Sequence, residues 1–144
     1  MRYINDIIVH CSDTPAHMNV TVDDIRAWHR ARGFSDIGYH YVIYRDGSVH
    51  YGRKVNYAGA HCKGHNAHSI GVCWIGGHGD DPNKKEYQDN RTDAQKAALK
   101  QLLARLMKMY HCKVHGHRDY APRACPCYDV HAEYDAIAKQ IIGW

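Results

Sequence analysis

Apolar residues in this chain form short runs that are typical of β-strands. Continuous runs rich in β-branched residues over 4–11 and 70–75 predict two strands buried on both faces. A hairpin is predicted around Asp46-Gly47-Ser48, because Asp-Gly favours a tight turn. Its two strands would be residues 39–45 and 49–53. A short run over 114–116 predicts one further strand.

Three longer segments repeat apolar residues every three to four positions, which predicts helices over 22–32, over 92–110 and from Asp129 onward. Two of them start with the pattern of a capping box, Thr21 with Asp24 and Thr92 with Gln95. The apolar faces that we expect are Val22, Ile25 and Trp28 in the first helix, Ala98, Leu99, Leu102, Leu103, Leu106 and Tyr110 in the second, and Val130, Tyr134, Ile137 and Ile141 in the third.

Together these elements predict an α/β fold, with a central mixed β-sheet covered by helices and residues 1–144 forming a single domain. Two segments without periodicity interrupt the pattern, an irregular loop over 53–69 and a long polar excursion over 76–91. Loops of that length in a compact domain are often the rim of a functional site.

The net charge and its distribution limit the classes of binding partner that we expect. The net charge is +4 and the pI is near 8.7, which suits an anionic polymer such as nucleic acid or a bacterial wall. The lysines over 96–108 lie opposite the apolar face of a helix, so we expect no nucleic-acid partner. The chain has no apolar run of membrane-spanning length, and Asn5 and Asp6 interrupt its N-terminal segment, so we expect neither membrane insertion nor a signal peptide, and synthesis in the cytoplasm.

The six cysteines and thirteen histidines outnumber what one site needs. Without an export signal we expect reduced thiols. Cys11 and Cys73 lie in predicted buried strands and are expected in the core, as are Trp28 and Trp74. His40 follows Tyr39 on a strand, faces the opposite side and is expected to be a hydrogen-bonded core residue.

Three residues have side chains that commonly bind zinc. His10 lies near the C-terminal end of the first predicted strand, and His117 and Cys125 lie in the loop segment 117–126. A catalytic Zn²⁺ takes about three ligands of these types and keeps a fourth position open. Two alternatives stay open at this stage, Cys127 in place of Cys125, or a closed structural site of His115, His117, Cys125 and Cys127.

The chain closely resembles the zinc-dependent N-acetylmuramoyl-L-alanine amidases of the peptidoglycan recognition superfamily, especially their phage lysozymes. The resemblance rests on four motifs in the same order, Val9-His10-Cys11-Ser12, Gly38 to Gly47, Ser69-Ile70-Gly71-Val72 and His117 to Pro126. It implies one Zn²⁺ on His10, His117 and Cys125, Tyr39 and Arg123 as catalytic residues, and His61 and Asn66 along the substrate cleft.

The implied reaction is hydrolysis of the amide between N-acetylmuramic acid and L-alanine in peptidoglycan. Such an amide needs an activated water and stabilisation of an oxyanion. The nearest relatives carry Lys where this chain has Arg123. Arginine keeps the cation, but its pKa above about 12 prevents proton shuttling, so Tyr39 or the zinc-bound water would have to protonate the leaving amine.

The resemblance also sets the biological expectation, a monomeric phage-type endolysin that reaches the cell wall through a holin or a dedicated secretion system. A wall-recycling enzyme, an exported toxin and a recognition protein that binds muropeptide without cutting it remain alternatives. One phage member also inhibits an RNA polymerase, in part through an N-terminal extension. This chain begins almost at its first strand, so we do not expect that partner.

Overall fold

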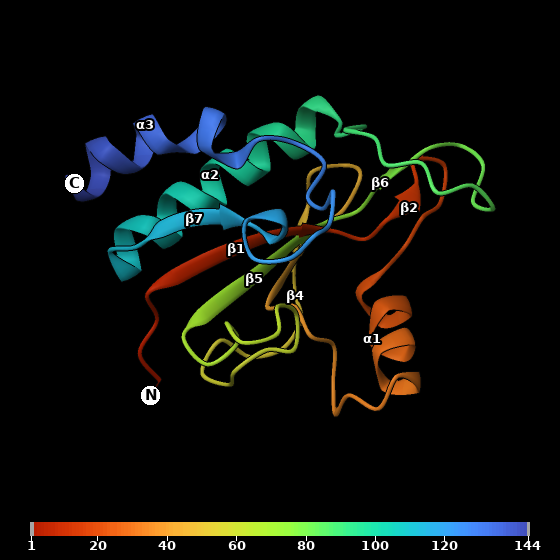
Figure 1. The fold of residues 1–144 in the computed structure, drawn as a ribbon, viewed down its shortest axis with the longest axis horizontal. Coiled ribbons are helices and arrows are strands. Elements are labelled where there is room, and N and C mark those ends of the chain that lie inside the picture. The colour runs from red at the N-terminus through yellow and green to blue at the C-terminus, as the bar shows by residue number, and fades with distance from the viewer. Residues whose placement is uncertain (1, 144) are drawn as a thin grey trace.

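The centre of the fold is a five-stranded mixed sheet with the order β4-β3-β5-β1-β7, which confirms the predicted α/β architecture (Figure 1). The computed structural model describes residues 2–143. Only the hairpin partner β4 is antiparallel; the other neighbours are parallel. The strands are β1 (Asp6–Cys11), β3 (Tyr41–Ile43), β4 (Val49–Tyr51), β5 (Ser69–Trp74) and β7 (Lys113–Gly116).

Three very short elements were not predicted. β2 (Thr14–Pro15) and β6 (Gly77–His78) form a separate two-stranded parallel pair, and η1 (His117–Asp119) is a 3₁₀ helix directly after β7. Elements of two or three residues are too short for a hydrophobic period to show.

The three predicted helices are present as α1 (Val22–Ala31), α2 (Asp93–Tyr110) and α3 (Val130–Ile142). Both predicted capping boxes form, Thr21 with Asp24 and Thr92 with Gln95. In Figure 1, α2 and α3 lie together on one side of the sheet and α1 lies on the other. No helix within residues 2–143 is both long and apolar enough to cross a membrane.

The two faces of the central sheet differ in the side chains that they present. Alternate residues of β1 point to opposite faces, and Ile7, Val9 and Cys11 belong to the core cluster that includes residues of α2 and α3. His10 therefore points to the opposite face. That face is where the sheet can present polar side chains without disrupting the main core.

One core prediction is wrong. Trp28 is 43% exposed, whereas the next residue of α1, His29, is only 7% exposed. His29 is buried because its Nδ1 accepts the backbone N–H of Gly38 at 2.8 Å and its ring packs against Tyr39. The burial predicted for Trp74, Cys11, Cys73 and His40 is confirmed.

Candidate metal centre and cleft

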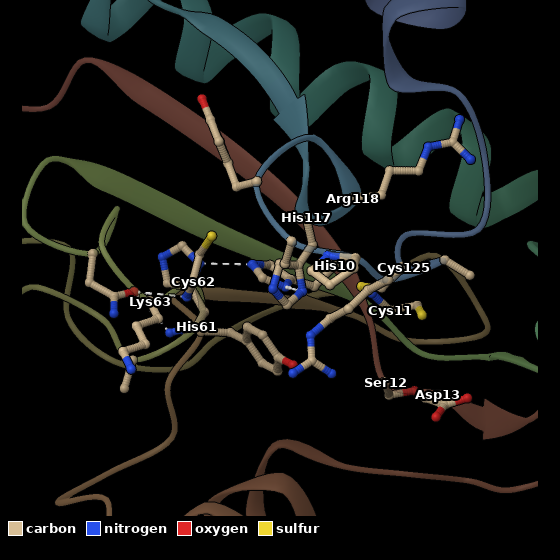
Figure 2. Close-up of a pocket in the computed structure, with 18 of the residues that line it drawn as sticks. His10, Cys11, Ser12, Asp13, His61, Cys62, Lys63, His117, Arg118 and Cys125 are labelled. Atoms are coloured by element: carbon tan, nitrogen blue, oxygen red, sulfur yellow. Dashed lines mark hydrogen bonds between the residues drawn. The ribbon is translucent and has the colours of Figure 1, made fainter.

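His10, His117 and Cys125 come together although they are far apart in the sequence. Parallel pairing of β1 with β7 sets Val9 opposite Gly116. The next residues are His10, near the end of β1, and His117, directly after β7, so they lie side by side. One ligand atom from each of the three residues lies within 4.8 Å of the others. Figure 2 shows His10, His117 and Cys125 grouped in the middle of the pocket.

The distance between the two imidazoles fits a zinc ion. Nδ1 of His10 lies 3.2 Å from Nδ1 of His117. Two nitrogens that each bind zinc at about 2.0–2.1 Å with a tetrahedral angle are about 3.3 Å apart. Burial, and then the neighbouring His61 and His117, lower the pKa of His10 well below its usual value. Both the spacing and the neutral imidazole favour metal ligation.

Cys125 completes the group with a sulfur that already accepts a hydrogen bond. The backbone N–H of Cys11 donates to Sγ of Cys125 at 3.1 Å. Two histidines and one cysteine are the donor set of a catalytic zinc site with an open fourth position, so the residues fit the ion.

The two alternative ligand sets are not formed. Sγ of Cys127 lies 3.7 Å from Sγ of Cys11 and 3.4 Å from the carbonyl oxygen of Gly77. Cys127 is not part of the ligand group around His10, and His115 belongs to a different group. Within the described residues, the closed four-ligand site is therefore absent.

His61 lies against His10, one of the candidate ligands. Its Nδ1 is 2.8 Å from Nε2 of His10, and its Nε2 is 3.1 Å from Oγ of Ser69. If His10 offers Nδ1 to a metal, its Nε2–H donates to His61, whose own Nε2–H donates to Ser69. This chain of donors fixes both tautomers, as outer hydrogen-bond partners do for metal-ligating histidines.

Two glycines make room for the His61 ring. A Cβ on Gly71 would lie 2.7 Å from ring atoms of His61, and a Cβ on Gly59 would lie 2.7 Å from its Cδ2. Contacts this short do not occur between real Cβ atoms and their neighbours. The ring therefore lies directly on the backbone, which holds it in one orientation.

Asn66 fixes the loop that carries His61. Its Oδ1 accepts the backbone N–H groups of His61 at 3.0 Å and Cys62 at 2.9 Å. Both His61 and Asn66 also line the cleft. The structure thus gives each of them an internal contact that the sequence did not predict, in addition to a position at the cleft.

Tyr39 and Arg123 flank the ligand group. The ring centroid of Tyr39 is 5.1 Å from that of His10. Burial raises the pKa of Tyr39 well above its usual value, so its hydroxyl keeps its proton. Arg123 is exposed, and after burial its positive charge contributes to lowering the pKa of His117. Both residues line the cleft, one with a hydroxyl donor and the other with a cation.

The cleft around these residues has a volume of about 1410 Å³. Pockets for small molecules usually measure about 300–1,000 Å³. Its walls come from the loop around His61 and from the segment 117–125, and Tyr87 from the polar excursion also contributes. The size suits part of a polymer. Tyr87 could not be found from the sequence, because nothing in an irregular loop indicates which way it folds.

Comparison with known proteins identifies the family. Residues 1–128 match the family model described as N-acetylmuramoyl-L-alanine amidase. The chain belongs to this family. As an amidase it is 46% identical over 125 residues to the endolysin of Enterobacteria phage T3, a match that covers 86% of this chain and 81% of that protein.

Two solved structures resemble this amidase in fold. The endolysin LysCS, an N-acetylmuramoyl-L-alanine amidase of Clostridium intestinale URNW, superposes with a TM-score of 0.74 at 32% identity and covers 87% of this chain and 76% of its own. A point mutant of Drosophila PGRP-LB in complex with tracheal cytotoxin superposes with a TM-score of 0.75 at 28% identity. The match covers 94% of this chain and 82% of that chain. These neighbours confirm the predicted family and fold.

Proposed function

We propose that this amidase hydrolyses the bond between N-acetylmuramic acid and L-alanine with one Zn²⁺ held by His10, His117 and Cys125. The observation that carries the metal assignment is the convergence of these three donors, with the imidazole nitrogens 3.2 Å apart, at the wall of a large cleft. The family membership and the endolysin relatives support the reaction.

The zinc ion, when bound, would polarise the amide carbonyl and make water a nucleophile near neutral pH. The chain's own residues supply the rest. Tyr39 keeps its hydroxyl proton and donates a hydrogen bond toward the developing oxyanion. Arg123, at the mouth of the cleft, adds a positive charge for the same oxyanion. We propose these two as the catalytic side chains.

Because this chain has Arg123 at this position, another residue must carry out the proton transfer. A guanidinium offers hydrogen-bond donors only and acts as a fixed cation, so Arg123 donates hydrogen bonds but does not pass a proton on. The leaving amine of L-alanine must gain one proton as the amide bond breaks. We assign Tyr39, whose ring lies 5.1 Å from that of His10, to relay it. The hydroxyl gives its proton to the amine and takes up the proton that the attacking water loses, so Tyr39 is protonated before and after the step.

We propose that the cleft binds peptidoglycan. Muropeptide binding is supported by the family and by the fold neighbour solved with tracheal cytotoxin. We propose that His61 and Asn66 contact the stem peptide from the loop wall while their inner atoms hold the loop and the ligand His10. Substrate contact and metal support are thus combined on one loop.

The relatives named endolysins support a phage-type role. We propose that the protein is made in the cytoplasm, acts as a monomer with one catalytic domain over residues 1–144, and reaches the wall after release by a holin or a dedicated secretion system. Expression from inside a host cell with and without a holin tests the release step, since lysis is expected only with it.

Products resolved by mass test the reaction itself. Purified peptidoglycan is incubated with protein that was stripped by chelator and then restored with Zn²⁺, beside Cys125→Ala treated in the same way. We expect new L-alanine amino termini only from the restored wild type. Muropeptide binding without cleavage by the zinc-loaded wild type would contradict the proposal and indicate a recognition protein.

A further inference from the structure

A second group of metal-binding side chains lies outside the site described above. It consists of His115 in β7, Asp119 in η1 and His131 in the first turn of α3. One ligand atom from each lies within 4.8 Å of the others. The side chains are 29%, 25% and 38% exposed, so an ion from solvent can reach them.

Both histidines of this group are oriented by a carboxylate on their other nitrogen. Nδ1 of His115 lies 2.7 Å from Oδ1 of Asp6, and Nδ1 of His131 lies 3.1 Å from Oδ1 of Asp135. Metal-ligating histidines almost always donate the second ring N–H to a carboxylate, a carbonyl or water, which leaves the other nitrogen for the ion. The two partners are thus already in place.

Asp119 faces the remaining nitrogen of His131. Its Oδ2 lies 2.7 Å from Nε2 of His131 and accepts the backbone N–H of Gly116 at 3.0 Å. The His131 ring therefore stands between two carboxylates, Asp119 and Asp135. An ion bound to Oδ2 of Asp119 and Nε2 of His131 takes the place of the hydrogen bond between them.

The carboxylates around the group favour a dication. Asp6, Asp119 and Asp135 surround the two imidazoles. A divalent ion bound by two imidazoles and one carboxylate compensates two negative charges, and nitrogen with carboxylate ligands suits Zn²⁺.

We infer that His115, Asp119 and His131 form a second Zn²⁺ site, which fastens η1 to the start of α3. His117, a ligand of the first site, and Asp119 lie two residues apart in the same 3₁₀ helix. A metal at the second site therefore steadies the segment that carries the first-site ligands. It has no ligand in common with the first site.

The zinc content of matched variants tests this site independently of catalysis. Native mass spectrometry and chelator competition are applied to chelated protein after Zn²⁺ is restored. We expect two ions in the wild type, one in His131→Ala and one in Cys125→Ala. The control His17→Ala replaces an exposed histidine outside both groups and should keep two.

A single ion in both the wild type and His131→Ala, or two ions in both, would overturn the second site. Failure of the first site has a different signature, because Cys125→Ala would then keep every ion of the wild type. This comparison separates the two assignments.

A milder variant covers the case in which His131→Ala does not fold. Asp135→Ala keeps all three ligands and removes only the carboxylate on Nδ1 of His131. Loss of such an outer partner typically weakens metal binding by about 10–100-fold. We expect that loss for the second equivalent of zinc, together with a smaller zinc-induced rise in melting temperature. Unchanged affinity for the second equivalent would contradict the assignment.

Discussion

Nε2 of His10 lies 2.8 Å from Nδ1 of His61, while Nδ1 of the same ring faces His117. The imidazole of His10 thus lies between the other candidate ligands and a second imidazole. In a zinc site such an outer contact fixes the tautomer of the ligand. We therefore predict that His61 is a positioning residue as well as a residue of the cleft wall.

Removal of the outer imidazole should weaken zinc binding. We expect His61→Ala to lower the zinc affinity of the first site by about 10–100-fold, because His10 then loses the acceptor for its Nε2–H. His61→Gln should restore part of that loss, since its amide oxygen can accept the same hydrogen bond. Chelator competition measures both, and equal affinity in all three proteins would show that His61 only contacts substrate.

Gly71 should be needed because of the ring that it supports. A Cβ at this position would lie 2.7 Å from the His61 ring, so Gly71→Ala must displace it. Overpacking of this kind costs about 1–3 kcal/mol of the free energy of unfolding. The double variant Gly71→Ala/His61→Ala removes the clash and should unfold at a higher denaturant concentration than Gly71→Ala alone. Additive effects in this cycle would contradict the contact.

Arg123 should affect turnover without affecting the metal. Loss of one oxyanion donor typically lowers kcat by about 10²–10³-fold. We expect this for Arg123→Ala, with unchanged zinc content, and much of the activity should return in Arg123→Lys, which keeps the cation. Arg118→Ala is the matched control because Arg118 also lines the cleft but extends away from the ligand group in Figure 2. An equal loss in the control would remove the special role of Arg123.

His40 should make the fold sensitive to acid. Its Nδ1 accepts the backbone N–H of Gly71 at 3.0 Å, and burial lowers its pKa to about 4. The unfolded chain, with a histidine pKa of about 6.5, binds more protons between these values, so stability is present above pH 6.5 and is lost as the pH falls toward 4. The loss amounts to about 3.5 kcal/mol at most, from about 1.4 kcal/mol for each of about 2.5 pKa units.

Denaturant unfolding of the chelated protein from pH 7 to 4 measures this effect. His40→Asn keeps an acceptor for Gly71 but does not titrate, so its stability should depend less on pH than that of the wild type. His17→Asn, at an exposed position, should follow the wild-type curve. Parallel curves for wild type and His40→Asn would contradict the assignment.

Much of the fold could be predicted because its signals are local. The buried runs of β1 and β5 and the capping boxes of α1 and α2 are visible in consecutive residues. The burial of Trp28 was predicted wrongly because Trp28 and His29 both lie near the apolar face of α1. The hydrogen bond from Gly38 to His29 decides between them, and it joins segments whose contact no local pattern shows.

In the candidate site, too, some features could be predicted from the sequence and others could not. His10, His117 and Cys125 could be proposed from residue type and motif, and the structure brings them together. The contact between His61 and His10, the loop bonds of Asn66 and the group of His115, Asp119 and His131 depend on tertiary packing. Among thirteen histidines, residue type alone does not indicate which rings meet.

The most direct test of the central claim replaces each of two neighbouring cysteines. Cys125 belongs to the ligand group, whereas the thiol of Cys127 lies against Cys11 and Gly77. First-site zinc content and peptidoglycan hydrolysis are measured for the wild type, Cys125→Ala and Cys127→Ala. We predict that Cys125→Ala loses both the ion and the activity, while Cys127→Ala keeps both. Hydrolysis that survives in Cys125→Ala, or that is lost with the zinc in Cys127→Ala alone, would contradict this account of the amidase.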